Sequence, residues 1–408
     1  MKLSIIIIGD EILLGQVTDT NSGAIARAFG PLGFSVAGIR TVADDADAIR
    51  RAVAEAMATS ELTVTTGGLG PTKDDITKLT LRDIFGGEMR RDPQVTANIE
   101  RVFADRGLKM NEITADQALV PDSCRVIQNR LGTAPIMWFE RDGHVVVSMP
   151  GVPFETEGAL PELTEQVRKC FTPDLRLFHH TFIVHGITES DLSDSLEGFE
   201  ARLANGLHLA YLPDSGIIRL RLDGVGDDAL APKFEEACAR IRRELGPLLI
   251  HDGDATPAEI VLEAVRARGL SLGTAESCTG GNIARSITLI PGASDIFYGG
   301  VVSYANSVKI DVLGVDRADL EAHGAVSREV VEQMAAGACR VLGVRCAVAT
   351  SGIAGPGGGT PDKPVGTVWM GWCVDGCVAS EVRRFPGDRA RVITRATNEA
   401  LLGLLKLL

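Results

Sequence analysis

The first ninety or so residues alternate between short apolar runs and amphipathic stretches. Residues 3–8, 34–39 and 62–66 have the length and β-branched content of strands, whereas 21–29 and 45–57 carry apolar residues at helical spacing. Strands and helices that alternate in this way predict a parallel, doubly wound sheet. The sequence therefore predicts an α/β fold whose N-terminal sheet is mostly parallel.

An insertion is expected between about residues 92 and 140, with a helix over 93–105. A strand over 144–148 and a helix over 153–169 follow, because their apolar periods change from two to 3.6. We therefore expect the first domain to span residues 1–170.

The periodicity changes after residue 170. Strand-like stretches at 181–184 and 216–222 alternate with helical stretches at 190–203 and 233–245. This mixture predicts a small α+β module over 171–250, which would serve as a spacer or as a dimerisation unit.

A turn-rich stretch at 251–255 predicts a linker, and a third domain is expected over 254–408. Thr256, Pro257 and Glu259 match the start of a helix, with a threonine N-cap, a proline in the first turn and a glutamate that bonds back to the N-cap.

The third domain is predicted to be α/β with a mixed sheet, because Val374-Asp375-Gly376 gives a hairpin signal between two strand-like runs. The expected strands cover 270–275, 297–304, 346–351, 366–373 and 377–385, and the expected helices cover 280–289, 327–342 and 389–407.

Charge and cysteine usage exclude several classes of function. The 41 basic and 54 acidic residues give a net charge of −13 without any basic run, so we expect no nucleic-acid partner. The 8 cysteines lack both disulfide density and zinc-ligand spacing, which indicates reduced thiols and a cytoplasmic location. No apolar stretch is long enough to cross a bilayer, so no membrane association is expected.

A strand-to-helix turn at 274–281 provides a candidate nucleophile. Ser277 falls on this turn with its hydroxyl exposed, and the backbone N–H groups around Thr279, Gly280 and Gly281 are expected to bind the oxyanion of a tetrahedral intermediate. The geometry suits acyl transfer. The alternative is that Ser277 or Thr279 only caps the helix.

The usual base for such a serine is a histidine, and this part of the chain offers no suitable one. After residue 208 the only histidines are His251 and His323, and neither follows a motif that orients a nucleophile. Lys309 is the remaining candidate, because desolvation makes a lysine a competent base. Its alternative role is an exposed cation at a helix start. Cys278 is a rival nucleophile, since a helix N-terminus activates a thiolate.

Two further features bear on phosphate recognition. The glycine-rich loop at 350–359 follows a strand, where open α/β sheets collect ligands, although such loops are also plain connections. Arg389 and Arg391 begin the last helix and are expected to clamp a phosphate, with surface solvation as the alternative.

These motifs resemble the CinA family (competence/damage-inducible protein A). The resemblance is carried by Ala-Glu-Ser-Cys-Thr-Gly-Gly at 275–281, Tyr304 with Lys309, Gly-Ile-Ala-Gly-Pro-Gly-Gly at 352–358 and Lys-Pro-Val-Gly-Thr at 363–367. It implies a nicotinamide mononucleotide amidohydrolase that needs no cofactor. The residues implied are Ser277, Lys309 and Tyr304 for catalysis, and Thr279, Gly280, Gly281, Gly352, Ala354, Gly355, Arg389 and Arg391 for the oxyanion and substrate. Many members carry another arginine where this chain has Ile393.

Two N-terminal motifs, at 9–15 and 65–75, follow predicted parallel strands. They are expected to form a backbone cradle for phosphate beside carboxylates that hold a divalent cation. The expected residues are Gly67, Gly68, Gly70 and Thr72 for phosphate, and Asp10, Glu11, Asp74 and Asp75 for the metal. The alternative is that Asp74 and Asp75 complement a helix dipole.

These motifs, with those at 129–135 and 149–153, resemble the molybdopterin-binding MoCF-type fold of the CinA N-terminal half. That resemblance implies a metal-dependent ADP-ribose pyrophosphatase. Ile136 and Asp116 depart from its pattern, and we expect Ile136 to narrow the phosphate site and Asp116 to repel the substrate or alter the need for metal.

Together the resemblances imply an enzyme of pyridine nucleotide salvage, with nicotinamide mononucleotide and ADP-ribose as ligands and a homodimer as the assembly. The alternative is a non-catalytic module that binds molybdopterin or a nucleotide, or a regulatory protein related to competence. That alternative predicts ligand binding without turnover.

Overall fold

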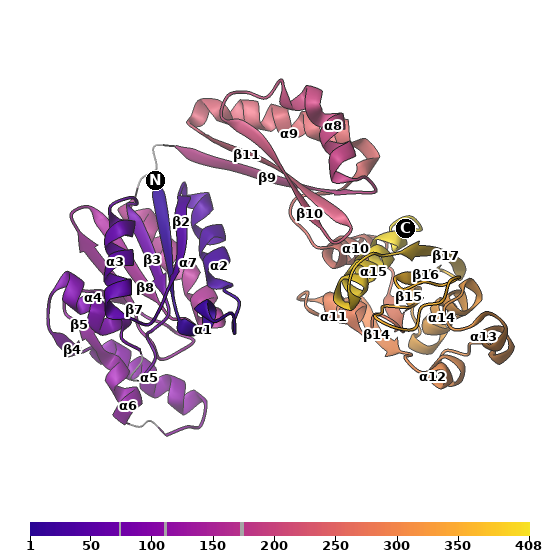
Figure 1. Cartoon of the computed structure of the whole chain (residues 1–408), viewed down its shortest axis with the longest axis horizontal. Helices are drawn as coiled ribbons and strands as arrows, with labels where there is room; N and C mark the ends of the chain where they lie inside the picture. The colour runs from indigo at the N-terminus through magenta and orange to yellow at the C-terminus, as the bar shows by residue number, and fades with distance from the viewer. Residues whose placement is uncertain (73–74, 110–111, 172–174) are drawn as a thin grey trace. The chain divides into compact units, whose positions relative to one another are not determined.

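The structure is a computed structural model that describes residues 1–72, 75–109, 112–171 and 175–408. It separates into two compact units, Met1–Phe178 with Gly224–Phe234 and His179–Asp223 with Glu235–Leu408 (Figure 1). Compactness alone does not show whether the middle segment folds independently, so the division into three domains stays a prediction.

The first unit contains a six-stranded sheet in the order β2-β1-β3-β8-β7-β6. The first four strands are parallel, which confirms the mostly parallel sheet. Strand β7 runs antiparallel to β8, and β6 runs antiparallel to β7 and so in the direction of the first four strands. The strands are β1 (Lys2–Ile8), β2 (Ser35–Val42), β3 (Leu62–Thr66), β8 (His144–Met149), β7 (Ile136–Arg141) and β6 (Arg125–Ile127).

Helices cover both faces of this sheet (Figure 1). On one face lie α2 (Asn21–Phe29) and α7 (Pro153–Cys170), and on the other lie α3 (Ala46–Met57) and α4 (Thr77–Phe85). The smaller elements are α1 (Asp10–Leu13), η1 (Gly30–Leu32), β4 (Met89–Arg91), α5 (Pro93–Asp105), α6 (Glu112–Ala115), η2 (Asp116–Ala118) and β5 (Leu119–Pro121).

Strand β7 was not expected from the sequence, and it corrects the interpretation of Ile136. The Ile136 side chain is fully buried in the apolar core with Ile127 and Trp138. It therefore does not narrow the phosphate site. Asp116 lies outside that core and pairs with Arg91 at 2.7 Å.

A four-stranded sheet in the order β10-β11-β9-β12 follows in the chain. The stretch at 251–255 was expected to be a linker, but its first two residues belong to β12, which pairs antiparallel with β9. The elements are β9 (Arg176–His185), α8 (Glu189–Glu200), β10 (Leu207–Asp214), β11 (Ile217–Gly226), η3 (Asp228–Leu230), α9 (Ala231–Leu245), η4 (Gly246–Leu248) and β12 (Leu249–Asp252).

The C-terminal part of the second unit is built on a five-stranded mixed sheet in the order β14-β13-β15-β16-β17. Strand β13 is parallel to β14 and β15, and β16 is antiparallel to β15. Strand β17 is antiparallel to β16, and the two form the hairpin that the sequence predicted. The strands are β13 (Leu272–Glu276), β14 (Phe297–Val302), β15 (Cys346–Gly352), β16 (Thr367–Val374) and β17 (Cys377–Arg384).

Helix α14 packs on one face of this sheet, and α10, α11 and α15 pack on the other (Figure 1). The predicted capping box is present at Thr256 and Glu259. The helices are α10 (Pro257–Ala267), α11 (Asn282–Thr288), η5 (Ala293–Asp295), α12 (Asn306–Asp311), α13 (Arg317–His323), α14 (Arg328–Leu342) and α15 (Arg389–Leu404).

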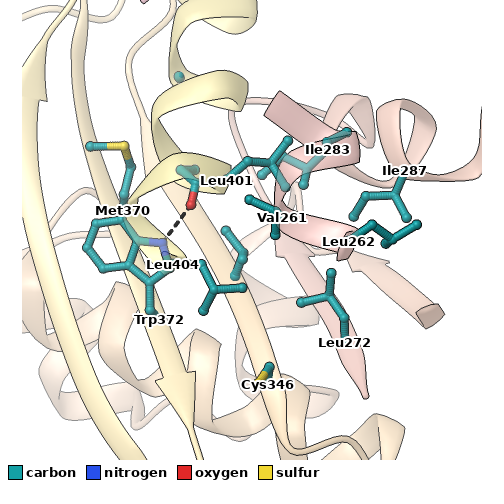
Figure 2. Close-up of a cluster of buried hydrophobic side chains, with 14 of the residues drawn as sticks. Val261, Leu262, Leu272, Ile283, Ile287, Cys346, Met370, Trp372, Leu401 and Leu404 are labelled. Carbon is teal, nitrogen blue, oxygen red and sulfur yellow. Dashed lines mark hydrogen bonds between the residues drawn. The ribbon is translucent and has the colours of Figure 1, made fainter. Parts of the chain in front are cut away.

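Figure 2 shows the core between this sheet and α15. The Trp372 indole is 4% exposed and donates from Nε1 to the carbonyl of Ala400 at 2.6 Å. A Cβ on Gly403 would overlap the indole, so glycine lets α15 lie close to the sheet. This packing fixes the helix whose first residues reach the candidate site. Among the described helices, none combines the length and the apolar character needed to cross a bilayer.

Candidate active site

The ends of three neighbouring strands meet at one edge of the C-terminal sheet. Because β13, β14 and β15 are parallel, the residues that follow them lie side by side. Ser277 follows β13, Tyr304 lies just beyond β14, and Gly352 ends β15. The fold thus brings together residues that are far apart in sequence.

Ser277 and Lys309 are in direct contact. Lys309 Nζ lies 3.1 Å from Ser277 Oγ, and it donates to the carbonyl oxygens of Ser303 at 2.7 Å and Tyr304 at 3.4 Å. Two carbonyls match the two N–H bonds of a neutral amine, which leaves the nitrogen lone pair for the serine hydroxyl. The arrangement suits proton removal from the serine.

Burial favours the neutral form of this lysine. Lys309 is 1% exposed, and no carboxylate of the described residues forms a salt bridge with it. Desolvation lowers the pKa of Lys309 from 10.5, and the nearby Cys278 acts weakly in the opposite direction. The alternative, that Lys309 is an exposed cation at a helix start, is therefore wrong.

Cys278 is poorly suited to be the nucleophile. Its side chain is 6% exposed and belongs to the apolar core, and burial raises the pKa of its thiol to about 12. The thiol therefore stays protonated at neutral pH. Ser277 is the better nucleophile on this turn.

The turn after Ser277 corrects part of the predicted oxyanion site. The N–H of Gly280 donates to the carbonyl of Ser277 at 3.2 Å, and the N–H of Gly281 donates to the Glu276 carboxylate at 2.9 Å. Two of the three expected donors, Gly280 and Gly281, are thus already engaged. In the described chain, the N–H groups of Cys278 and Thr279 have no hydrogen-bond partner, so they are the donors that remain free.

Arg389 joins two other parts of the site. Its Nη2 donates to the Tyr304 hydroxyl at 3.0 Å, and its Nη1 donates to the carbonyl of Gly355 at 2.8 Å. Asp388 caps α15 by accepting from the N–H of Arg391 at 2.9 Å. The start of α15 is therefore fixed against the glycine-rich loop.

The other residues expected to bind substrate differ in what they can offer a ligand. The Ala354 methyl is 4% exposed in the apolar core, so only its backbone is available. Gly352 lies in β15 opposite Val368, whose atoms a Cβ on Gly352 would meet at 2.7 Å. Arg391 lines a cavity of about 460 Å³ with Arg395 and residues that include Pro213.

The N-terminal loop is shaped by close backbone approach. Gly67 has φ 112° and Gly68 has φ 62°, and a Cβ on either would overlap the Ile8 carbonyl or the Thr77 hydroxyl. The loop is therefore restricted to glycine at both positions by contacts within the protein, and its role as a phosphate cradle stays a prediction.

The structure describes three of the four acidic residues predicted to bind a metal, which are Asp10, Glu11 and Asp75. The Asp75 carboxylate accepts from the N–H of Gly70 at 2.8 Å and from the N–H of Thr72 at 2.9 Å, so it closes its own loop. Asp74 lies outside the described residues. Among the residues that the structure describes, no group of three His, Cys, Asp or Glu side chains is placed to hold a metal ion. The predicted metal set therefore does not fit the described part by itself.

The sequence interpretation missed several residues around both sites. Burial and the neighbouring acids Asp10, Glu11 and Asp75 raise the pKa of Asp44, although the Asp10 N–H opposes this. Lys78 is 8% exposed, and burial lowers its pKa to about 8.

In the C-terminal site the missed residues are Glu276, Ser303 and Thr350. Only Glu276 gave a usable signal, because a carboxylate at the end of a buried strand needs donors.

Comparison with known proteins gives matches over almost the whole chain. Residues 254–408 match the family model "CinA C-terminal domain", and residues 4–169 match "Probable molybdopterin binding domain". A CinA-like protein of Cytophaga hutchinsonii is 39% identical over 98% of this chain and 96% of its own length. One from Gemmatimonas aurantiaca is 41% identical over 98% and 95%.

The solved structures that match cover about two fifths of this chain. The competence/damage inducible protein CihA from Agrobacterium tumefaciens is 40% identical, covers 37% of this chain and 93% of its own, and has a TM-score of 0.36. The protein CinA from Thermoplasma acidophilum is 34% identical, covers 41% and 97%, and has a TM-score of 0.38.

Proposed function

Because this chain belongs to the CinA family, we propose that its C-terminal domain deamidates nicotinamide mononucleotide with Ser277 as nucleophile and Lys309 as base. The observation that carries the proposal is the 3.1 Å contact between the buried Lys309 amine, which forms no salt bridge in the described chain, and the hydroxyl of the half-buried Ser277. A lysine with two carbonyl acceptors and no carboxylate partner in the described chain is suited to accept a proton.

The proposed reaction proceeds through an acyl-enzyme. Lys309 Nζ takes the hydroxyl proton of Ser277 while Oγ attacks the carboxamide carbon, and the N–H groups of Cys278 and Thr279 stabilise the oxyanion. The Lys309 ammonium then protonates the leaving nitrogen, which departs as ammonia. Water, deprotonated by Lys309, hydrolyses the ester of nicotinate mononucleotide and restores Ser277. The products are nicotinate mononucleotide and ammonia.

Arg389 and Tyr304 are proposed to orient the substrate, because their hydrogen bond at 3.0 Å holds both polar groups beside the nucleophile. Arg391 is proposed to contact the phosphate. No step uses a metal ion, so we expect ammonia release to continue at the same rate in EDTA.

An ammonia-release assay tests the proposal. The full chain and a shortened chain that starts near Asp254 are each given nicotinamide mononucleotide. Acid-quenched samples are searched by mass spectrometry for the ester of nicotinate mononucleotide on Ser277. Ser277→Ala should abolish turnover, whereas Ser294→Ala, an exposed serine on η5, should not change it. Ligand binding without turnover would favour a regulatory module instead.

For the N-terminal domain we propose metal-dependent hydrolysis of ADP-ribose. The supporting observation is that Asp10 and Asp44 lie side by side: the Asp10 N–H donates to the Asp44 carboxylate at 3.1 Å, and the Asp44 N–H donates to the Asp10 carboxylate at 3.4 Å. A bound cation would relieve the repulsion between the two carboxylates. The described residues do not complete a ligand set, so no catalytic step is assigned to them. Isothermal titration of ADP-ribose with and without Mg²⁺ or Mn²⁺, alongside phosphate release, tests this proposal. The homodimer also stays a prediction, which light scattering checks.

A further inference from the structure

Glu276, the last residue of β13, accepts hydrogen bonds from four donors. Its Oε2 accepts from the Thr279 hydroxyl at 2.7 Å and from the N–H groups of Gly281 at 2.9 Å and Ile283 at 3.0 Å. Its Oε1 accepts from the N–H of Ala284 at 2.8 Å. One side chain therefore binds the donors at the start of α11.

This carboxylate does not face the substrate. Glu276 is 1% exposed, and both of its oxygens are engaged. Its negative charge lies against the positive end of α11, where it is stabilised. Glu276 is thus poorly placed to exchange protons with a ligand, and its effect must pass through the turn that it holds.

The backbone of Glu276 also reaches the base. Its carbonyl accepts from the N–H of Ser303 at 2.8 Å, and the Ser303 carbonyl accepts from Lys309 Nζ at 2.7 Å. The same residue therefore orders the turn that carries Ser277 and the strand end that holds Lys309.

Strand β15 fixes the turn from the other side. The Thr350 carbonyl accepts from the N–H of Ser277 at 2.9 Å, and the hydroxyls of Thr350 and Thr279 lie 2.7 Å apart. With Gly281 already bound to Glu276, the N–H groups of Cys278 and Thr279 are left free in the described chain.

We propose that Glu276 is a positioning residue for the amidase, an inference that rests on the proposed function. Its carboxylate sets the turn so that Ser277 stays within reach of Lys309 and two N–H groups stay directed to the oxyanion. A simple helix cap would contribute stability alone, whereas a positioning residue also controls the rate of acylation.

The test compares Glu276→Gln with Glu259→Gln. Glu259 is a matched control, because it caps α10 by accepting from the N–H of Thr256 at 2.7 Å and takes no part in the site. At a temperature well below each variant's unfolding midpoint, Glu276→Gln should lower kcat about tenfold and change KM less than twofold, whereas Glu259→Gln should change neither.

A second measurement does not depend on the substrate. A fluorophosphonate probe reacts with an activated serine, and its rate on Ser277 should fall about tenfold in Glu276→Gln and stay unchanged in Glu259→Gln. If the wild type reacts with the probe but does not release ammonia, the proposed substrate is wrong and the positioning role is still decided by the probe. A wild type that does not react with the probe overturns both proposals.

Thr279→Val serves if Glu276→Gln does not fold. It removes one of the four donors and keeps the carboxylate, so it should lower the probe rate several-fold, and Thr279→Ser should restore it. If folded Glu276→Gln reacts with the probe and turns over substrate as fast as the wild type, Glu276 is only a helix cap. A higher KM with unchanged kcat in this variant would also overturn the proposal.

Discussion

Arg389 donates a hydrogen bond from Nη2 to the hydroxyl of Tyr304 at 3.0 Å, although Tyr304 is 62% exposed. An exposed tyrosine that is held by an arginine loses little further conformational entropy when a ligand binds. The pair also connects β14 to the glycine-rich loop through the Gly355 carbonyl. These contacts make the pair a preformed wall of the site.

The first prediction concerns this hydroxyl. Tyr304→Phe should lower kcat/KM for nicotinamide mononucleotide about tenfold, because a hydrogen bond to a charged group contributes roughly 1.5–3 kcal/mol. Tyr298 provides the control, since it is also 62% exposed and lies on β14, the strand that precedes Tyr304. Steady-state kinetics compare Tyr304→Phe with Tyr298→Phe. An equal kcat/KM in the two variants would contradict the proposed role of the Tyr304 hydroxyl.

The second prediction follows from the buried amine. Desolvation lowers the pKa of Lys309 below 10.5, and only the neutral form is a base, so kcat/KM should rise with pH through that lowered pKa. Between the lowered pKa and 10.5 the unfolded chain binds one proton more than the folded chain, so stability should also rise with pH there.

Lys309→Met should abolish the rise of kcat/KM with pH and the rise of stability with pH. We expect turnover to fall by about 10²–10⁴ and the slope of stability in this pH window to flatten, as measured by thermal unfolding at several pH values. Lys406→Met should keep both, because Lys406 is exposed and paired with Glu381. An unchanged pH–rate profile in Lys309→Met would assign the titration to another group.

The third prediction separates the two possible nucleophiles. The buried Cys278 thiol has a pKa raised to about 12, so iodoacetamide should modify the exposed Cys170 and Cys377 and leave Cys278 intact. Activity should survive this treatment and also survive Cys278→Ala. Peptide mapping identifies the modified thiols. A loss of activity that tracks modification of Cys278 would remove Ser277 from the nucleophile's role.

The sequence predicted the pair of Ser277 and Lys309 by elimination, because neither histidine after residue 208 follows a motif that orients a nucleophile. In the structure the two residues lie 3.1 Å apart because they follow the neighbouring parallel strands β13 and β14. The sequence did not predict which N–H groups stay free. That depends on the positive φ of Gly280 and Gly281, which turns their N–H groups toward Ser277 and Glu276. Hydrogen-bond partners within a turn follow from its dihedral angles rather than from its composition.

The N-terminal half shows the same limit. Gly67 was predicted to bind phosphate, and the structure shows that a Cβ on Gly67 would overlap the Ile8 carbonyl. Asp75 was assigned to a metal, but its side chain binds the N–H groups of Gly70 and Thr72. Ile136 was assigned to the phosphate site, but it lies in a buried strand. A residue type suggests possible ligands, whereas the direction of its side chain is set by packing.

The fourth prediction tests the phosphate contact. Arg391 and Arg395 are four residues apart on α15 and line the same cavity of about 460 Å³. Arg391→Ala should raise KM for nicotinamide mononucleotide about tenfold, because it removes a charge-assisted hydrogen bond to the phosphate. Nicotinamide riboside lacks the phosphate, so its kinetics should not change. Arg268→Ala, in a separate cavity, is the control variant. An equal loss with both substrates would exclude a phosphate contact.

The fifth prediction concerns Gly337, inside α14. A Cβ there would overlap the carbonyl oxygen of Leu313, in the segment whose Val315 N–H donates to the Lys309 carbonyl at 3.0 Å. Gly337→Ala should therefore destabilise the protein by about 1–3 kcal/mol, because the clash outweighs the higher helix propensity of alanine. It should also lower kcat, since the displaced segment supports the base.

Gly198 gives the matched comparison for Gly337, because it lies inside α8 and a Cβ there meets only open space. Gly198→Ala should stabilise the protein by up to about 1 kcal/mol and leave kcat unchanged. Urea unfolding and ammonia release measure both variants. If Gly337→Ala were as stable and as active as Gly198→Ala, contact between α14 and Leu313 would not hold Lys309 in place, and the position of the base would depend on the strand end at Ser303 alone.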